Sequence, residues 1–237
     1  MSSEKQFEIS KERIDLYLKD LAKEYRKLIG KRMPAEVILV GGASVLVNYG
    51  FRHMTTDVDA LIHAASCMKD AINTVGNRYE LPAGWLNSDF EKTLSYSPKL
   101  VECSVYYKTY ANVLTVRTVS AEYLIAMKLR SGRQYKSDLS DILGILSEHE
   151  KRGEPIQMDN IRKAVSDLYG AWEVLSKTSI DFINNVMNNG RFEDLYSKVI
   201  NEEKVNKNVL IRFEADYPGI AKESNIEDII KQLRSGL

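Results

Sequence analysis

Cysteine and histidine are scarce in this chain of 237 residues. The two cysteines, Cys67 and Cys103, lie in apolar surroundings, where packing is the ordinary role of a cysteine, and a single disulfide between them is the alternative. The three histidines, His53, His63 and His149, show no ligand spacing with the cysteines. A structural zinc site is therefore not expected.

Long apolar runs and an excess of one charge are also missing. No apolar stretch approaches the roughly 20 residues that a membrane-spanning helix needs, and the polar start "MSSEKQFEISKERID" lacks the apolar core of a signal peptide. The 33 basic and 33 acidic residues balance. This balance argues against an acidic tail and a strongly basic nucleic-acid wrapper, but it does not exclude a local basic groove. We expect a cytoplasmic protein that does not bind membranes.

What is present is an ordinary globular composition, 44% hydrophobic and 28% charged. A mixed pattern runs to about residue 150: an amphipathic helix ending near Gly30, then apolar strands alternating with helices. The strands are expected in "VILV", "DVDALI", "KLVECSVYY" and "NVLTVRTV". From Ser120 onward the periodicity is helical, with Ser120 and Asp138 as expected N-caps and further helices over 158–168, 171–187, 192–200 and 226–233.

This pattern predicts an α+β fold, a small mixed sheet flanked by helices and followed by a helical region. We expect an α/β domain with its N-terminal helix at residues 1–150 and a helical C-terminal domain at residues 151–237.

Two aspartates interrupt the apolar segment "RHMTTDVDALI". Burying a charge is costly unless the charge is paired or binds a metal. Residues two apart on a strand point to the same face, about 6.5–7 Å apart along the chain. Asp57 and Asp59 can therefore converge on a cation, and hard oxygen ligands suit Mg²⁺. The alternative is two solvent-facing acids on a half-exposed strand.

A glycine pair follows the expected strand at residues 37–40. Gly41 and Gly42 let the backbone turn sharply and let a ligand approach, and the helix that follows offers free N–H groups to a phosphate. Ser44 adds a hydroxyl. The alternative is an ordinary turn between a strand and a helix.

Together these elements carry a resemblance. The segment "VILVGGASVLVNYGFRHMTTDVDALI" resembles the nucleotidyltransferase superfamily signature of an apolar strand, a glycine pair, a short helix and D-x-D on the next strand. It looks most like a bacterial branch near the toxins of AbiE-type toxin–antitoxin pairs, in which an arginine and a threonine precede the acids, as Arg52 and Thr56 do here. The segment "SAEYLIAMKLRSGRQYKSDLSDILGIL" is similar to a second block of that branch. The resemblance covers about residues 36–146.

The resemblance implies a nucleotidyltransferase-like fold and a nucleotide site. Asp57 and Asp59 would bind Mg²⁺. A third carboxylate on a neighbouring strand would activate the attacking hydroxyl, and Glu102 is the candidate, with an ordinary polar-face residue as the alternative. The residues implied to hold the nucleotide are Gly41, Gly42, Ser44, Arg52, Thr56 and Lys128.

Lys128 is our first choice for a phosphate contact and Arg52 the next. The alternatives for Lys128 are a solvated helix face or an ion pair with Asp138 or Asp141, which share one helix face at i and i+3. We interpret Asp138 as a helix cap and Asp141 as a structural partner that orients Lys128.

The basic turn "LRSGRQYK" carries Arg130, Arg133 and Lys136 around Tyr135. Basic side chains interleaved with an aromatic ring can guide an RNA end. The alternative is a solvated charge cluster.

The leading hypothesis is Mg²⁺-dependent transfer of a nucleoside monophosphate from an NTP to an acceptor hydroxyl. The acceptor candidates are the 3′ end of tRNA, a protein hydroxyl and a small molecule, and the resemblance suggests the toxin of a toxin–antitoxin pair with a cognate antitoxin as partner. The alternative is a catalytically inactive nucleotide-sensing or partner-binding module on the same fold. A third idea, an all-helical scaffold with incidental acids, is disfavoured by the strand patterns.

Overall fold

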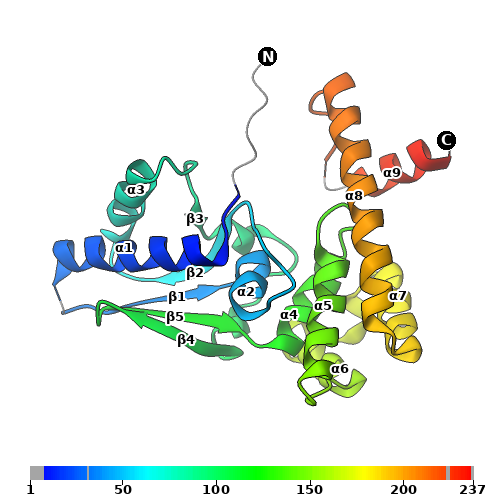
Figure 1. The fold of residues 1–237 in the computed structure, drawn as a ribbon, viewed down its shortest axis with the longest axis horizontal. Coiled ribbons are helices and arrows are strands. Elements are labelled where there is room, and N and C mark those ends of the chain that lie inside the picture. The colour runs from blue at the N-terminus through cyan, green and yellow to red at the C-terminus, as the bar shows by residue number, and fades with distance from the viewer. Residues whose placement is uncertain (1–7, 31, 223–224, 236–237) are drawn as a thin grey trace.

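The computed structural model describes residues 8–30, 32–222 and 225–235. A sheet with helices on it lies at one end of the molecule, and a group of helices lies at the other (Figure 1). The helices are α1 (Lys11–Ile29), α2 (Gly41–Asn48), α3 (Met68–Arg78), α4 (Ala121–Ser131), α5 (Asp138–Lys151), α6 (Met158–Tyr169), α7 (Lys177–Asn189), α8 (Phe192–Asp216) and α9 (Ile226–Ser235). Three short 3₁₀ helices are η1 (Asp89–Lys92), η2 (Pro98–Val101) and η3 (Trp172–Val174).

The described residues form one mixed sheet of five strands in the order β3-β2-β1-β5-β4. These strands are β1 (Ala35–Leu39), β2 (Val58–His63), β3 (Leu86–Asn87), β4 (Ser104–Tyr110) and β5 (Leu114–Val119). The central strand β1 is parallel to β5 and antiparallel to β2, whereas β4 is antiparallel to β5. The predicted fold class, α+β with a mixed sheet flanked by helices, is confirmed.

Each face of the sheet belongs to a different apolar cluster. Val37 and Leu39 of β1 pack in a cluster that includes the buried side chains of α1 and α3. Ile38 and Val40 belong to a second cluster, which continues through α4, α5, α6 and α7 to Phe192 at the start of α8. Side chains of a strand alternate between faces, so one short apolar strand supplies both cores.

The helical elements after β5 pack on one another as well as on the sheet. Helix α4 packs on α5 and α6, and α5 packs along α8. Buried residues of α4 and α5 share the second cluster with Val40 and Val119 from the sheet. The division into domains at residues 150 and 151 stays a prediction, and the apolar cluster is continuous across it.

One predicted strand is wrong in part. Residues 99–103 do not continue β4. Pro98 begins η2 instead, since its fixed φ suits the first turn of a helix. The Ser104 hydroxyl donates to the carbonyl of Val101 at 2.6 Å and closes this turn. Strand β3, two residues long, was not predicted.

Three helix predictions need correction. The expected helix over 171–187 is divided into η3 and α7, because Ser176 caps α7 by accepting the Ser179 N–H at 3.1 Å. Helix α8 is much longer than the expected 192–200. The N-cap of α5 is Ser137, and Asp138 is the first residue inside the helix.

The cysteines and the helices bear on two further expectations. Cys67 and Cys103 are free thiols, so the alternative of a disulfide between them is wrong. No helix within residues 8–30, 32–222 and 225–235 has the length and apolar character to cross a membrane.

Candidate nucleotide site

The glycine pair forms the first turn of α2, directly after β1. Gly41 has a φ of +52°, a left-handed conformation that glycine adopts without steric cost. A Cβ on Gly42 would lie 2.7 Å from Nη2 of Arg52. A side chain at position 42 would displace the Arg52 guanidinium, which packs against the backbone of this turn.

Arg52 is held in this place by several contacts. Its Nε donates to the carbonyl of Met54 at 3.1 Å, and its Nη1 forms an ion pair with Asp141 of α5. Thr56 is exposed, next to Asp57. The neighbouring Thr55, which sequence analysis passed over, is buried and donates its hydroxyl to the carbonyl of Asp57 at 3.1 Å.

Ser44 lies inside the protein. Its side chain is fully buried, and its hydroxyl oxygen accepts the backbone N–H of Val119 at 3.2 Å. This bond ties α2 to the end of β5. The structure thus brings Gly41, Gly42 and Arg52 together at the surface of the turn and does not bring Ser44 there.

The two aspartates flank Val58 at the start of β2. Val58 is buried in the cluster under α1 and α3, so Asp59, the next residue of β2, faces the opposite side of the sheet. Asp57 precedes the strand and is exposed. Asp59 pairs with the end of β1, where its carbonyl accepts the Val40 N–H at 3.0 Å. Asp59 therefore lies on the strand next to β1, opposite Val40, the residue before the glycine turn.

The electrostatics of Asp59 are those of a crowded carboxylate. Burial raises its pKa to about 6, and the negative charge of Asp57 adds to the rise. Lys136 and Arg133, from the turn between α4 and α5, act in the opposite direction and lower that pKa. A bound divalent cation would relieve the repulsion between the two acids.

Asp89 is a third acid near this pair that sequence analysis missed. Its charge also raises the pKa of Asp59. It follows β3, whose Asn87 pairs in register with Asp59, and Asn87 Oδ1 accepts the Asp89 N–H at 2.8 Å. The carboxylate of Asp89 is exposed and forms an ion pair with Lys92 at 2.7 Å. A strand of two residues has no readable periodicity, so the sequence carries no signal that would place Asp89 here.

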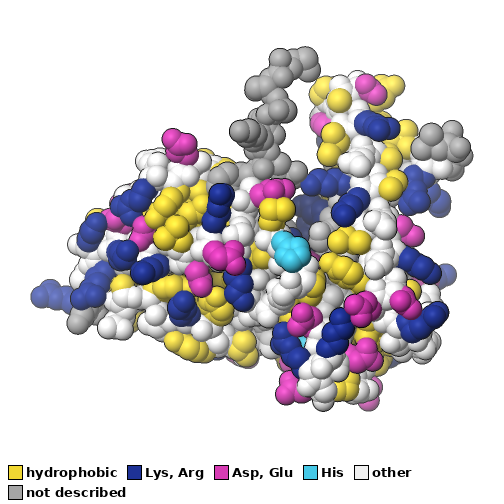
Figure 2. Space-filling model, viewed as in Figure 1, with side chains coloured by type: hydrophobic (Ala, Val, Ile, Leu, Met, Phe, Trp, Pro, Cys, Tyr) yellow, Lys and Arg dark blue, Asp and Glu magenta, His cyan; other side chains and the backbone are white. Residues whose placement is uncertain are grey.

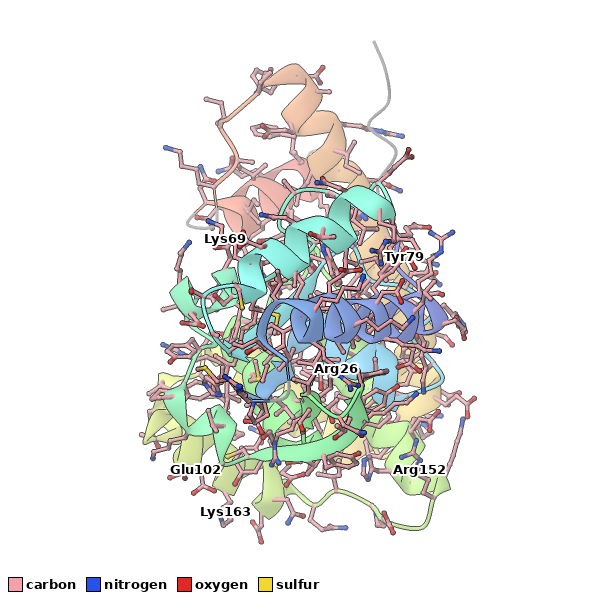
Figure 3. The ribbon with its side chains drawn as sticks, turned by 90° about the vertical axis from the view of Figure 1, so that its left-hand side faces the viewer. Arg26, Lys69, Tyr79, Glu102, Arg152 and Lys163 are labelled. Carbon is pink, nitrogen blue, oxygen red and sulfur yellow. The ribbon has the colours of Figure 1, made fainter. Side chains whose placement is uncertain are left out.

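Glu102 lies elsewhere. The expectation that it sits on a strand beside Asp57 and Asp59 is wrong, because it ends η2 and leads into β4, with β5 and β1 lying between β4 and β2. Three strand spacings amount to roughly 14 Å. Figure 3 shows Glu102 at the same edge of the molecule as Lys163 of α6. Glu102 lines a groove of about 560 Å³ with Tyr123 and Asp167. Within the described ranges, no three His, Cys, Asp or Glu side chains are grouped to hold a metal ion.

Lys128 is buried in a charge network. Its Nζ lies 2.8 Å from carboxylate oxygens of both Asp138 and Asp141. Arg133 pairs with Asp138 at 2.8 Å, and Arg52 pairs with Asp141. The alternative of an ion pair for Lys128 is thus what the structure has, and the assignment of Asp141 as its partner is confirmed. Lys128 contacts the two aspartates and acts on the glycine turn through Asp141 and Arg52.

The charges in this network stabilise one another. Burial alone would raise the pKa of Asp138, but Lys128 and Arg133 hold it well below its usual range. Burial alone would lower the pKa of Lys128, but Asp138 and Asp141 raise it. The network therefore holds Arg52 beside the glycine turn and Arg133 at the start of α5. Guanidinium groups held in this way can donate hydrogen bonds to a phosphate.

Comparison with known proteins gives one family match. Residues 17–164 match the family described as "Nucleotidyltransferase of unknown function (DUF6036)". This range begins within α1, ends within α6, and includes the glycine turn, both aspartates and the charge network. No curated protein and no solved structure matches the chain.

Proposed function

Because the chain belongs to this family of nucleotidyltransferases of unknown function, we propose that it transfers a nucleoside monophosphate from an NTP to an acceptor hydroxyl, with Mg²⁺ held by Asp57 and Asp59. One observation carries the proposal: two mutually repelling carboxylates lie beside a glycine turn that is covered by an arginine.

The two carboxylates suit Mg²⁺. Proteins usually hold this ion through one or two carboxylates, while substrate phosphates and water complete its coordination. Asp57 and Asp59 would supply that pair. When bound, the ion would neutralise charge on the α-phosphate and on the departing pyrophosphate.

The chain's own residues would bind and orient the triphosphate. The start of α2 offers backbone N–H groups and the positive end of the helix dipole. Arg52, fixed by Asp141, presents its guanidinium at Gly42. The charges of Arg133 and Lys136, in the turn between α4 and α5, offset that of Asp59. Positioning and electrostatic stabilisation supply most of the catalysis in phosphoryl-type transfers.

The direct test incubates the protein with each labelled NTP, Mg²⁺ and total RNA, and separately with total protein as acceptor. We expect label transfer that depends on Mg²⁺ and disappears in the double variant Asp57→Ala, Asp59→Ala. Transfer that survives this double change would contradict the proposal. The 3′ end of tRNA, a protein hydroxyl and a small molecule are the proposed acceptors, and a toxin role with a cognate antitoxin rests on the resemblance alone.

A second candidate is a nucleotide-sensing or partner-binding module. It is favoured by the position of Glu102, which leaves the described residues without a three-carboxylate group at the glycine turn. Mg²⁺-dependent NTP binding without transfer to any acceptor would support this module over the enzyme.

A further inference from the structure

The long helix α8 caps the start of α5 with a buried acid. Glu203 Oε1 accepts the backbone N–H groups of Leu139 at 3.0 Å and Ser140 at 3.1 Å, and its Oε2 accepts the Ser140 hydroxyl at 2.5 Å. The first N–H groups of a helix have no partner within the helix. Glu203, which is 6% exposed, supplies that partner from a distant part of the chain.

Two further side chains of the same region hold the preceding turn. Asn206 of α8 donates to the carbonyl of Gln134 at 2.9 Å. Glu227 of α9 accepts the Gln134 backbone N–H at 3.3 Å and its side-chain N–H at 3.2 Å. The segment from Gln134 to Ser140 is therefore fastened at both of its ends by α8 and α9, which lie outside the range that the family match covers.

The fastened turn is connected directly to the nucleotide site. Asp138 and Asp141 lie on either side of the two residues that Glu203 caps. Asp141 holds Arg52 against Gly42, and Asp138 holds Arg133. Figure 1 shows α8 alongside α5, extending beyond it above the level of α2. Figure 2 shows Lys and Arg side chains gathered at the recess between the sheet end of the molecule and upper α8.

We propose that Glu203 is a positioning residue for the nucleotide site: by capping α5 it fixes Asp138 and Asp141, and through them the two arginines that face the glycine turn and the acids. The proposal rests on the proposed function. The charged form of Glu203 is disfavoured in this place. Burial raises its pKa to about 7, and the charge of Asp141 adds to the rise. Asn206 and Glu227 act with Glu203 on the same turn.

The first test measures binding of MgATP, MgCTP, MgGTP and MgUTP by calorimetry to the full chain. For whichever nucleotide binds, Glu203→Ala is expected to weaken affinity by about tenfold, a coupling typical of residues in one network. Glu203→Gln keeps an acceptor for both N–H groups and is expected to restore most of the affinity. The matched control is Glu202→Ala, an exposed acid one residue earlier, which should bind like the wild type. Equal affinity for Glu203→Ala and the wild type would overturn the proposal.

The second test asks whether Glu203 acts through Arg52. In an Arg52→Ala background, Glu203→Ala should cost less affinity than it does in the wild type, because the group that it positions is already gone. Fully additive losses would overturn the proposal. If Glu203→Ala fails to fold, the substitute variant is Glu227→Ala, at an exposed residue of α9. It is expected to weaken nucleotide affinity by a smaller factor, and wild-type affinity in Glu227→Ala would overturn the proposal.

Amide hydrogen exchange separates this proposal from the proposed function. In Glu203→Ala without nucleotide, the amides of Leu139 and Ser140 should exchange faster, whereas amides of α3 should not change. Unchanged protection at α5 would overturn the positioning role. If the wild type binds no nucleotide, the proposed function fails, while the exchange result still reports on whether Glu203 fixes this turn.

Discussion

Asp59 is half-buried on β2, and burial together with the charge of Asp57 raises its pKa to about 6. A cation bound at this carboxylate would favour its charged form and displace the proton. Asp57, one position outside the strand, is exposed and sets the local charge. At the scale of single residues, the candidate site pairs an exposed carboxylate with a half-buried one, and the charge of Asp57 raises the pKa of Asp59.

Asp57→Asn is expected to abolish Mg²⁺-dependent nucleotide binding, because one hard oxygen ligand and one negative charge are lost. Calorimetry with MgATP, MgCTP, MgGTP and MgUTP measures this. The matched control is Asp70→Asn, an exposed acid in the first turn of α3. Undiminished binding in Asp57→Asn would mean that the metal site lies elsewhere.

Binding of Mg²⁺ and nucleotide should also strengthen as pH rises from about 5 to about 7.5, since the cation competes with the proton on Asp59 and that proton leaves through a pKa of about 6. Asp89→Asn removes a charge that raises this pKa, so its binding midpoint should move to lower pH. Calorimetry over this pH range is the measurement. A midpoint that stays in place, or moves upward, would contradict this electrostatic account.

At the scale of elements, the turn between α4 and α5 organises the site. Lys128 of α4 is enclosed by two acids from the first turn of α5, and those acids hold one arginine from the turn and one from the loop before β2. Breaking a buried ion pair by removing one partner is costly, because the other charge stays buried. The packing of α4 on α5 therefore depends on Lys128, Asp138 and Asp141 together.

Lys128→Met is expected to lower the free energy of unfolding by about 3–5 kcal/mol, since Asp138 and Asp141 would remain buried without their central cation. Urea unfolding gives the value. Lys69→Met, on an exposed position of α3, is the control and should change stability by less than about 0.5 kcal/mol. Equal stability of the two variants would show that the network contributes little.

At the scale of the whole molecule, α8 and α9 meet the turn that borders the glycine loop and the acids. The sheet and the helices share an apolar cluster that runs from Val40 to Phe192. Where α8 packs on α5, the Glu203 carboxylate caps α5. The C-terminal helices therefore hold the turn beside the candidate site, whose proposed residues all precede them in the chain.

Stability should fall as pH rises from about 4.5 to about 7. The pKa of Glu203 is raised from an ordinary value of 4.5 to about 7, so in this window the folded state keeps a proton that the unfolded state has lost. Glu203→Gln removes the titrating group and should reduce this decline. Urea unfolding at several pH values across the window measures the slope, and an identical slope in both proteins would contradict the assignment.

The local sequence pattern was sufficient to predict an element wherever a few neighbouring residues decide its structure. The glycine pair after an apolar run predicted the start of α2, and the alternation in "DVDALI" predicted β2, because strand alternation depends only on the chain itself. That Asp57 and Asp59 share one face stays a prediction, since Asp57 precedes the strand. The alternation in "ECSVYY" predicted a strand, but Pro98 starts a 3₁₀ turn just before it and Glu102 falls in that turn.

The sequence by itself determined the fold class, the glycine turn and the strand that carries Asp59, because each depends on periodicity or spacing within one segment. Only the tertiary structure decided which charges meet. Arg52 and Asp141 are 89 positions apart, and Glu203 reaches α5 across more than 60 positions. No local pattern encodes such pairings, since they follow from how α5 and α8 pack after the chain has folded.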